Sequence, residues 1–456
     1  MNLPSSFLRS LEGLPGYDAA AFEAAHHQEK QLVSLRINST KISEQAVTED
    51  WDASITLTKV DWCSTGYYLS ERPSFTLDPK FHAGAYYVQE ASSMFLAQAM
   101  LQTVDLTQPL VVLDLCAAPG GKSTLLQSLI SNESLLISNE VIQSRVSVLR
   151  ENIMKWGADN VIVTNNDPRD FKQFGAIADV LVVDAPCSGS GLFRRDPEAI
   201  QEWSAGNVTH CSLRQQRILA DAWQTLKEGG ILIYSTCSYA AEENEQVLSW
   251  LINELHAAPK RLSLQANWGM LEVETPNGGY GYRCWPHKVQ GEGFFLAVVQ
   301  KTHAAADHAH RVNKNAIPSR KEIDIAARWL KDAQQYDYIL QGDQLAVVNK
   351  CHTEMIQQLM SLLRVRYAGV ELGTIAKNDL LPSHALALSH CLSESIPSVS
   401  LSLPQALQYL RKQEMVLDVQ HKGWTSAMYC TLRLGWMKCL GNRINNYYPK
   451  DYRILK

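Results

Sequence analysis

Short apolar runs alternate with longer amphipathic stretches between residues 111 and 300. The apolar runs predict buried strands at 111–115, 135–138, 161–164, 180–183, 231–235 and 293–299. The stretches between them predict helices at 122–130, 141–156, 210–227 and 241–255. Continuous apolar strands that alternate with helices are typical of a parallel sheet covered on both faces. We therefore expect an α/β core.

The chain on either side of this core has a different pattern. Strand-like runs at 31–38 and 66–69 and a helix at 90–100 precede it, and a Gly-, Trp- and Tyr-rich segment predicts a small β-rich module at the C-terminal end. At 456 residues the chain is too long for one ordinary core. The predicted units are an N-terminal domain at 1–90, the core at 91–301, a linker at 302–318, an intermediate α/β domain at 319–384 and the β-rich module at 385–456.

Composition limits where such a protein works. No apolar stretch is long enough to span a bilayer, and the first residues lack the pattern of a signal peptide. Ten cysteines without any CxxC pair favour a reducing compartment, so we expect a cytoplasmic protein with no metal centre and no membrane. The His-rich stretch at 303–310 is interpreted as part of a solvated linker.

Charge is unevenly distributed along the chain. The net charge is −5, but residues 301–456 carry a net +7 and residues 1–300 a net −12. A basic third on an acidic body indicates a module that holds an anionic polymer such as RNA.

A glycine turn directly after the first core strand predicts a ligand site. The turn consists of Cys116, Ala117, Ala118, Pro119, Gly120, Gly121 and Lys122. Glycines at such a turn let a ligand approach the backbone, and the following helix presents free N–H groups. A P-loop would need a glycine where Cys116 stands, and the G-x-G-x-x-G fingerprint of dinucleotide sites is absent.

The third possible ligand is a nucleoside whose ribose is held by an acid after the second strand. Glu140 stands at that position, and Asp167 follows the third strand, within reach of an adenine ring. S-adenosylmethionine fits the turn and both acids without a phosphate-binding loop. The alternative interpretation is that the glycines only form a tight turn and that the two acids are exposed to solvent and bind no ligand.

Two cysteines follow the ends of two later core strands. Cys187 lies in Asp184-Ala185-Pro186-Cys187, and Cys237 lies in Ser235-Thr236-Cys237-Ser238. Carbon 5 of cytosine accepts a methyl group only after a thiolate has added to carbon 6, a step that needs support at ring nitrogen 3. Cys237, Asp184 and Cys187 have the residue types for the addition, the support at nitrogen 3 and the later release. The other cysteines are expected to be buried apolar groups.

The target base of this chemistry must be unstacked from its neighbours before a thiol can reach it. Arg194 and Arg195 follow the Cys187 loop. They are candidates for contacts with the phosphates of the RNA backbone. The equally weighted alternative is that they only form a solvent-exposed helix cap.

The core motifs resemble those of the NOL1/NOP2/Sun family of RNA cytosine-C5 methyltransferases. The matching stretches are 86–94, 114–122, 184–191, 234–238 and 291–295. The resemblance implies a class I, Rossmann-like methyltransferase core and an N-terminal RNA-recognition-like α+β domain. It implies that Cys237 attacks the base and that Cys187 promotes release. It also implies that S-adenosylmethionine contacts residues 116–122, Glu140, Asp167 and Asp184.

The C-terminal third resembles that of the bacterial members that methylate one cytosine of 16S ribosomal RNA and carry a PUA-like module. The matching stretches are 369–373, 382–387, 435–438 and 445–449. Trp424, Trp436, Tyr447 and Tyr448 are expected to be packing residues. The residues expected to contact RNA are Lys438, Arg443, Lys450 and Arg453.

We therefore predict a monomeric, S-adenosylmethionine-dependent methyltransferase that acts on ribosomal RNA or the small ribosomal subunit. Three alternatives remain: a transfer RNA methyltransferase with the same core, a non-catalytic ribosome assembly factor, and a P-loop ATPase, which Cys116 disfavours.

Overall fold

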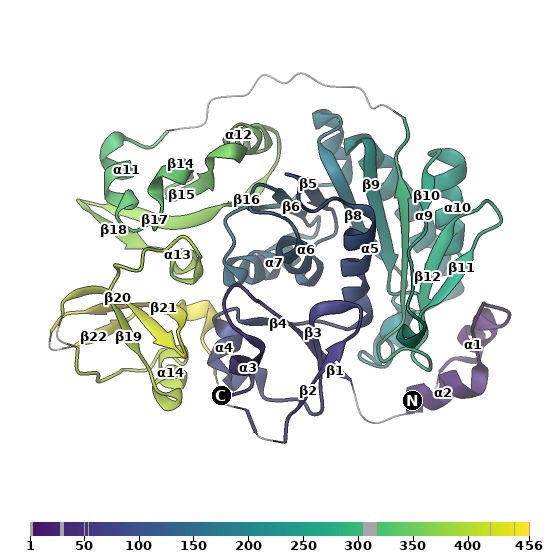
Figure 1. The fold of residues 1–456 in the computed structure, drawn as a ribbon, viewed down its shortest axis with the longest axis horizontal. Helices are drawn as coiled ribbons and strands as arrows, with labels where there is room; N and C mark the ends of the chain where they lie inside the picture. The colour runs from purple at the N-terminus through teal and green to yellow at the C-terminus, as the bar shows by residue number, and fades with distance from the viewer. Residues whose placement is uncertain are drawn as a thin grey trace.

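The computed structural model describes residues 3–27, 32–49, 51–52, 54–303, 317–419, 421–441 and 443–455. Four β-sheets with their helices make up the described part of the chain (Figure 1). Most of the predicted linker, including the His-rich stretch from residue 304, lies outside the described residues. No helix in the described ranges combines the length and the apolarity needed to cross a bilayer.

A ten-stranded sheet forms the centre of the molecule. Along it the strands follow the order β11-β12-β13-β9-β8-β5-β6-β7-β16, and β10 pairs with β13. The five adjacent strands from β9 to β7 are parallel. Their bounds are β5 Val111–Asp114, β6 Leu135–Asn139, β7 Val161–Thr164, β8 Ala178–Asp184 and β9 Leu226–Thr236. The predicted α/β core is confirmed.

The sheet is mixed, however, because the strands that follow β9 reverse direction. The apolar run predicted as the last strand forms β13, which pairs antiparallel with β9. The remaining strands of this part are also antiparallel to their neighbours. Their bounds are β10 Ala258–Lys260, β11 Leu271–Glu274, β12 Tyr280–Cys284 and β13 Phe294–Gln300. An apolar run shows that a strand is buried but not which way it runs, so the sequence pattern could not predict this reversal.

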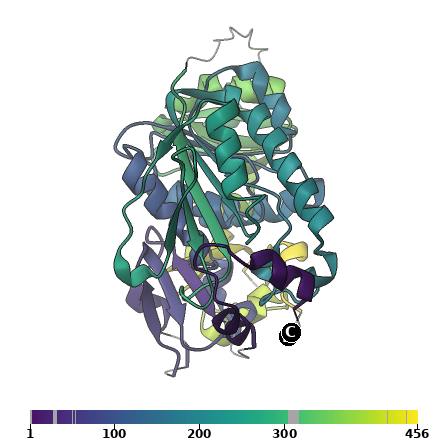
Figure 2. The ribbon, with the colours of Figure 1, turned by 90° about the vertical axis from the view of Figure 1, so that its right-hand side faces the viewer.

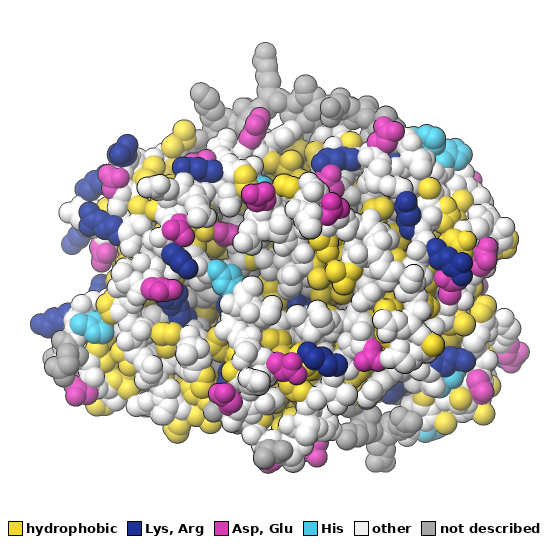
Figure 3. All heavy atoms as spheres, in the orientation of Figure 1, with side chains coloured by type: hydrophobic (Ala, Val, Ile, Leu, Met, Phe, Trp, Pro, Cys, Tyr) yellow, Lys and Arg dark blue, Asp and Glu magenta, His cyan; other side chains and the backbone are white. Residues whose placement is uncertain are grey.

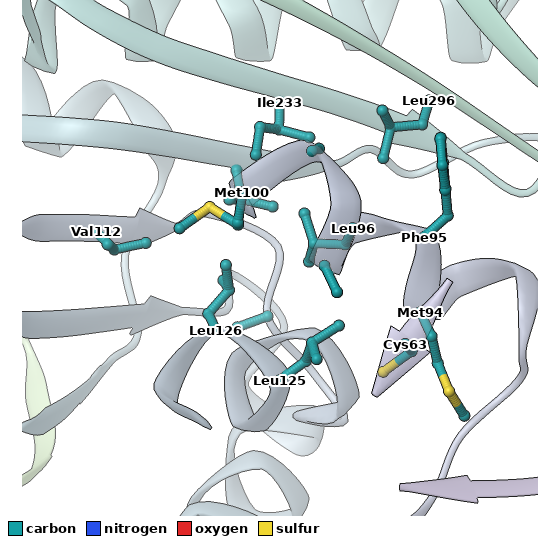
Figure 4. Close-up of a cluster of buried hydrophobic side chains, with 14 of the residues drawn as sticks. Cys63, Met94, Phe95, Leu96, Met100, Val112, Leu125, Leu126, Ile233 and Leu296 are labelled. Atoms are coloured by element: carbon teal, nitrogen blue, oxygen red, sulfur yellow. The ribbon is translucent and has the colours of Figure 1, made fainter. Parts of the chain in front are cut away.

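Helices cover both faces of the central sheet. On one face, α5, α6 and α7 pack against Val112 and Ile233; on the other, α9, α10 and α12 pack against Leu113 and Leu232. Figure 4 shows α5 residues such as Leu96 and Met100 between the sheet and Leu126 of α6. Figure 2 shows α9 and α10 from the side. The bounds are α5 Leu96–Thr103, α6 Gly121–Leu129, α7 Gln143–Trp156, α8 Ala199–Glu202, α9 Ala205–Ala222 and α10 Glu245–Glu254.

The N-terminal part contains a helical hairpin and a separate sheet. The sheet has the order β2-β3-β1-β4 and lies below the core in Figure 1. Its elements are β1 Val33–Ile37, α3 Glu44–Val47, β2 Leu57–Val60, β3 Cys63–Leu69, α4 Pro79–His82 and β4 Tyr86–Val88. The hairpin, α1 Ser5–Leu11 and α2 Ala19–His27, packs instead on Phe193, Tyr239 and Trp285 of the core.

The segment after the linker forms a third sheet, of order β14-β15-β17-β18, and also extends the central one. Its strand β16 pairs antiparallel with β7, which the sequence did not predict. The strands are β14 Tyr336–Gln341, β15 Gln344–Asn349, β16 Val365–Ala368, β17 Val370–Ala376 and β18 Asp379–Pro382. The helices are α11 Arg320–Ala327, α12 Thr353–Leu362 and α13 His384–Leu388.

The C-terminal sheet has the order β19-β20-β21-β22, which confirms the predicted β-rich end. Its elements are β19 Ser398–Ser400, α14 Leu403–Leu410, β20 Gly423–Tyr429, β21 Leu432–Cys439 and β22 Ile444–Asn446. Tyr409 and Leu434 share one apolar cluster with Leu35 and Phe75 of the N-terminal part. The C-terminal sheet therefore packs against the N-terminal sheet beside the core (Figure 1).

Several side chains differ from the predicted burial. Cys351 and Cys430 are exposed, whereas the sequence analysis expected them to be buried. Trp424, Trp436 and Tyr448 are buried as expected, but Tyr447 is 45% exposed because it lies at the rim of the C-terminal sheet, against Trp424. Lys and Arg side chains recur along the left edge in Figure 3, over α11, β18 and β22, with acidic side chains among them.

Candidate active site

The carboxyl ends of β8 and β9 bring the predicted catalytic residues to one edge of the central sheet. Asp184, the last residue of β8, pairs in register with Ser235 of β9. The Ser235 hydroxyl donates a hydrogen bond of 2.8 Å from Oγ to Oδ1 of Asp184. In sheets of this kind the ligand crevice lies outside the carboxyl ends of the strands. The edge therefore has the position of an active site.

The two predicted cysteines meet at this edge. The Sγ atoms of Cys187 and Cys237 are 3.0 Å apart, although the residues are 50 positions apart in the chain. A hydrogen bond with Cys237, followed by burial, raises the pKa of the Cys187 thiol well above its usual range. Cys187 therefore keeps its proton at neutral pH and has a hydrogen to donate in this pair.

A lysine from the glycine turn approaches the same point. Lys122 Nζ lies 2.7 Å from Oδ2 of Asp184. Burial by itself lowers the pKa of Lys122, but the Asp184 carboxylate and the nearby Cys237 sulfur raise it by more, so the net direction is upward. Lys122 is therefore an ammonium group that brings a positive charge to this edge of the sheet, beside Asp184.

A carboxylate that the sequence analysis missed joins the two cysteine loops. Glu243 is fully buried, and its Oε2 accepts hydrogen bonds of 2.5 Å from Oγ of Ser188 and 2.5 Å from Oγ of Ser238. Its Oε1 accepts the Ser188 backbone N–H at 2.8 Å and Nε2 of Gln215 at 3.1 Å. Ser188 and Ser238 directly follow the cysteines, so Glu243 determines how the two thiols sit relative to each other.

Only weak sequence signals marked Glu243. It lies in the acidic run Glu242-Glu243-Asn244-Glu245, which begins five residues after Cys237 and reads as a solvated helix start. Burial raises the pKa of its carboxyl group, while the hydrogen bonds from Ser188 and Ser238 lower it by less.

Aromatic residues from the N-terminal hairpin support the same loops from behind. Phe7 packs against Phe193, with ring centroids 5.0 Å apart, and Phe22 packs against Tyr239 at 5.2 Å. Tyr239 stands two residues after Cys237 and stacks on Trp285. The hairpin thereby limits the movement of both cysteine loops.

The glycine turn lies between β5 and α6. Gly120 precedes the helix with φ of 113°, a left-handed conformation that favours glycine. The turn is held by hydrogen bonds from Asn152 Nδ2 to the Pro119 carbonyl at 2.8 Å and from Arg145 Nη2 to the Ala118 carbonyl at 2.5 Å. Burial raises the pKa of the Cys116 thiol at the start of the turn. Cys116 is therefore held as a neutral thiol.

The two predicted cofactor acids differ in how they are held. Glu140 is buried; its Oε1 accepts the Ile142 N–H at 2.8 Å, while Oε2 accepts no hydrogen bond and lies 3.4 Å from Nη1 of Arg145. Asp167 is half-buried and caps a short 3₁₀ helix through the Arg169 N–H at 3.2 Å. Glu140 thus offers a buried acceptor to a ligand hydroxyl, and Asp167 lies at the rim.

The two candidate phosphate-binding arginines also differ. Arg194 is almost buried, with Nη1 3.3 Å from the Gly291 carbonyl and Nε 3.8 Å from Oε2 of Glu292. Its side chain therefore supports the loop and is not available to a phosphate. Arg195 is exposed, so it remains a candidate for contact with an RNA phosphate.

Family models match most of the chain. The model described as 16S rRNA methyltransferase RsmB/F matches residues 101–300. The N-terminal domain of 16S rRNA methyltransferase RsmF matches residues 3–91, and the RsmF PUA domain matches residues 396–454. Ribosomal RNA small subunit methyltransferase F of Psychromonas ingrahamii is 30% identical over 480 aligned positions, covering 98% of this chain and 97% of the relative. The chain belongs to the RsmF family of methyltransferases.

Further relatives agree with this family. The Shewanella piezotolerans protein of the same name is 29% identical and covers 92% of this chain and 90% of its own length. A solved methyltransferase homologue from Pyrococcus horikoshii is 28% identical, with a TM-score of 0.53 over 66% of this chain and all of its own. Pyrococcus horikoshii NSun6, solved with SFG, has a TM-score of 0.56 at 19% identity over 66% of this chain and 98% of its own, and shares the fold.

As a member of the RsmF family, the protein is an S-adenosylmethionine-dependent RNA methyltransferase. The residues present fit this cofactor: the glycine turn lets a ligand approach the backbone, and Oε2 of Glu140, 3.4 Å from Nη1 of Arg145, is a buried acceptor to which no described residue donates a hydrogen bond. A carboxylate after the second strand is the usual partner of a ribose hydroxyl in such sheets. Bound S-adenosylmethionine supplies the methyl group.

Proposed function

We propose that this enzyme methylates carbon 5 of a cytosine in 16S ribosomal RNA through a covalent bond between Cys237 and the base. The observation that carries the proposal is the 3.0 Å approach of the Cys187 and Cys237 sulfur atoms, beside the Lys122–Asp184 ion pair. A pair of thiols is not needed for methyl transfer to a nitrogen or an oxygen. The names of the relatives, which are ribosomal RNA small subunit methyltransferases, support the choice of RNA.

The first step uses Cys237 as the nucleophile. Its sulfur adds to carbon 6 as a thiolate, and a new C–S bond forms. Cys237 loses one proton in this step and ring nitrogen 3 gains one, so the step neither takes up nor releases a proton overall. Asp184 accepts a hydrogen bond from the protonated nitrogen. The addition breaks the aromatic system, so carbon 5 becomes nucleophilic enough to take a methyl group.

The last step uses Cys187. After methylation the carbon 5 proton leaves to water, ring nitrogen 3 gives back the proton that it gained, and the C–S bond breaks to regenerate the Cys237 thiol. The aromatic ring is restored, and one proton is released overall. Because the pKa of Cys187 is raised, its thiol donates to Sγ of Cys237 while that sulfur leaves carbon 6. Removal of Cys187 therefore slows release and leaves the first bond intact.

Trapping of the adduct tests the proposal. Cys187→Ala, incubated with S-adenosylmethionine and 16S RNA, is expected to give a protein–RNA band on a denaturing gel. Cys237→Ala is expected to give neither band nor methylated product, and Cys351→Ala, at an exposed cysteine, serves as the control. A methylating Cys237→Ala enzyme would contradict the role of that residue.

The substrate is tested with three RNAs. Wild-type enzyme is expected to methylate free 16S RNA or small ribosomal subunits, and sequencing after bisulfite treatment identifies the cytosine. Faster methylation of transfer RNA would replace the 16S proposal, and S-adenosylmethionine binding without any methyl transfer would favour an assembly factor. We further propose that the enzyme acts as a monomer in the cytoplasm, which light scattering and cell fractionation check.

We also propose that the C-terminal module contributes RNA contacts. Arg443, Lys450 and Arg453 are exposed, and no ion pair to them is present among the described residues. Lys438 is half-buried and lies over the ring of Trp424, 4.9 Å from its centroid. Substitution of the three exposed residues by alanine is expected to weaken RNA binding and its salt dependence together.

A further inference from the structure

A cavity beside the glycine turn is not explained by the chemistry at the two cysteines. It has a volume of about 310 Å³ and lies between strand β4 and the C-terminal end of α7. We call it the β4 cavity; its lining includes Arg72, Phe75, Phe81, Tyr87, Asn152 and Lys155. Its volume is at the lower end of the range of about 300–1,000 Å³ for small-ligand sites. That size suits one nucleotide and excludes a duplex.

The walls of the β4 cavity combine aromatic rings with cations. Arg72 lies over the ring of Phe75, 5.3 Å from its centroid, and Lys155 lies over Phe81 at 5.2 Å. The charge of Lys155 is balanced by Glu151, whose Oε1 is 2.5 Å from Nζ. Arg72 is exposed, and within the described part of the chain no acidic side chain pairs with it. The mouth of the cavity therefore carries a free positive charge.

A second positive charge stands behind one wall. Arg36 is fully buried and lies over the ring of Trp156, 4.6 Å from its centroid. Its hydrogen bonds go to neutral groups, among them Oε1 of Gln89 at 3.1 Å and Oγ1 of Thr124 at 2.6 Å. No carboxylate of the described residues forms an ion pair with it. A buried cation without an anionic partner is costly and favours an anion nearby.

The β4 cavity continues toward the active site. A neighbouring narrow cavity shares Arg72 and Val88 with it and reaches Arg195 and Gly291. Arg195 follows the Cys187 loop, and Gly291 accepts a hydrogen bond from Arg194. This second cavity has a volume of only about 20 Å³, so what joins the two regions is a row of exposed arginines. We call the line from Arg195, after the Cys187 loop, through Arg72 to the aromatic rings the path.

The far end of this path also touches the cofactor turn. A Cβ atom placed on Gly121 would lie 3.2 Å from Cε1 of Tyr87, so the Tyr87 ring packs directly on the start of α6. Asn152, which lines the cavity, holds the Pro119 carbonyl of the same turn. Tyr87 is half-buried, with part of its ring open to the cavity.

We propose that the β4 cavity binds one unstacked base of the RNA strand that flanks the target cytosine, while phosphates of the connecting backbone lie at Arg195 and Arg72. Aromatic rings bind single-stranded bases without sequence preference, and arginines follow the backbone. The inference rests on the proposed function, because the strand that enters the path is the one whose cytosine reaches Cys237. The N-terminal sheet is then a nucleotide-binding wall of the active site.

Two substitutions separate the parts of this site. Arg72→Ala is expected to lower the slope of log affinity against log salt by about 0.7 for a single-stranded 16S fragment, the loss of one phosphate contact. Tyr87→Leu keeps an apolar side chain and is expected to weaken binding by about tenfold, with the slope unchanged. Both effects should disappear for a fragment cut so short that no nucleotide reaches the cavity.

A matched control and a folding check accompany the two variants. Arg261 is an exposed arginine that directly follows β10, away from the path. It lies over the ring of Tyr280 of β12, 5.2 Å from its centroid, and pairs with Glu272 of β11. Arg261→Ala is expected to bind RNA as the wild type does. The thermal midpoint and the affinity for S-adenosylmethionine show whether each variant is folded around the cofactor turn.

Photocrosslinking locates the base directly. Fragments with 4-thiouridine at successive flanking positions are expected to crosslink to the peptides that contain Phe81 or Tyr87 from one position only. Unchanged affinity and slope in both variants, with no such crosslink, would overturn the inference. If only binding of whole subunits were weakened, a protein partner would occupy the cavity and the inference would also be wrong.

The controls separate this inference from the proposed function. Wild-type enzyme that forms no 5-methylcytosine would refute the function itself. Wild-type enzyme that methylates its cytosine, while Arg72→Ala and Tyr87→Leu bind and react normally, would refute the cavity alone.

Discussion

Ser188 and Ser238 donate hydrogen bonds to the same oxygen atom, Oε2 of Glu243, and their own Oγ atoms are 3.2 Å apart. Each serine directly follows one of the two cysteines. The position of Cys187 relative to Cys237 therefore depends on one buried carboxylate that touches neither sulfur atom. Glu243 is in this sense a positioning residue.

Removal of this carboxylate should lower the rate of chemistry more than the binding of RNA. Glu243→Ala releases both serines, and displacement of a reacting group by about 1 Å can cost about a hundredfold in rate. We expect kcat for methyl transfer to fall by about that factor, with KM nearly unchanged. Single-turnover rates and adduct yield in a Cys187→Ala background measure the effect.

The adjacent acid provides the control for Glu243. Glu242 is exposed, so Glu242→Ala should keep wild-type kinetics. Glu243→Gln retains hydrogen-bonding atoms and should recover part of the rate that Glu243→Ala loses. Equal, wild-type rates in all three variants would exclude a positioning role.

Loss of the Lys122 charge should slow the chemical step. Lys122→Met removes the ammonium group that holds Oδ2 of Asp184 at 2.7 Å, so the carboxylate loses its fixed position at the active-site edge. The single-turnover rate should fall by about tenfold or more, and Lys122→Arg should restore part of it. Measurement at saturating S-adenosylmethionine separates this effect from cofactor binding, and an unchanged rate in Lys122→Met would contradict it.

The buried carboxyl group of Asp114 should make stability depend on pH. Burial raises its pKa to about 7, and the hydrogen bond from Ser123 lowers it by less. Between pH 4 and pH 7 the folded protein holds a proton that the unfolded chain has lost, so the free energy of unfolding falls as pH rises, by up to about 1.4 kcal/mol per pH unit. Below pH 4 both states are protonated, and above pH 7 the loss is complete.

Asp114→Asn isolates this contribution because it removes the titrating group. The stability of the variant relative to the wild type should increase as pH rises from 4 to 7 and stay constant above that. Chemical denaturation at several pH values measures the difference. A difference that does not change with pH would show that Asp114 has an ordinary pKa.

The aromatic cluster under the catalytic loops should be a main source of stability for the N-terminal hairpin. Phe22 is fully buried against Tyr239 and Trp285. Phe22→Ala removes a large buried ring, which typically costs about 3–5 kcal/mol. We expect proteolysis between the hairpin and β1 to become faster and methyl transfer to fall, whereas Leu101→Ala, at a 53% exposed side chain on α5, should change neither.

The strands and helices of the core could be predicted because their signals are local. The run 161–164 coincides with β7, the runs 135–138, 180–183 and 231–235 lie inside β6, β8 and β9, and the runs 111–115 and 293–299 each extend one residue beyond β5 and β13. A strand buried on both faces is apolar at nearly every position, which a sequence shows directly. The direction of β13 and the addition of β16 beside β7 depend on pairing between distant segments, which no local pattern encodes.

The candidate site was predictable to the same extent. Asp184 ends β8, Cys187 follows it by three residues and Cys237 directly follows β9, so parallel pairing alone brings them to one edge of the sheet. Lys122 reaches that edge from the first turn of α6. Glu243 was missed because its partners, Ser188 and Ser238, become its neighbours only after folding. Arg194 was considered for phosphate because its sequence position resembles that of Arg195, but its ion pair with Glu292 removes it from the surface.

The amino-acid sequence determined which residues could carry the chemistry, because a thiol, a carboxylate or a glycine turn has its properties wherever it stands. The tertiary structure decided which of them act together. It brought two sulfur atoms to 3.0 Å, buried Glu243 beneath them and closed the β4 cavity between segments from the N-terminal sheet and α7. Distances and burial are set by long-range packing, and only the folded chain contains that information.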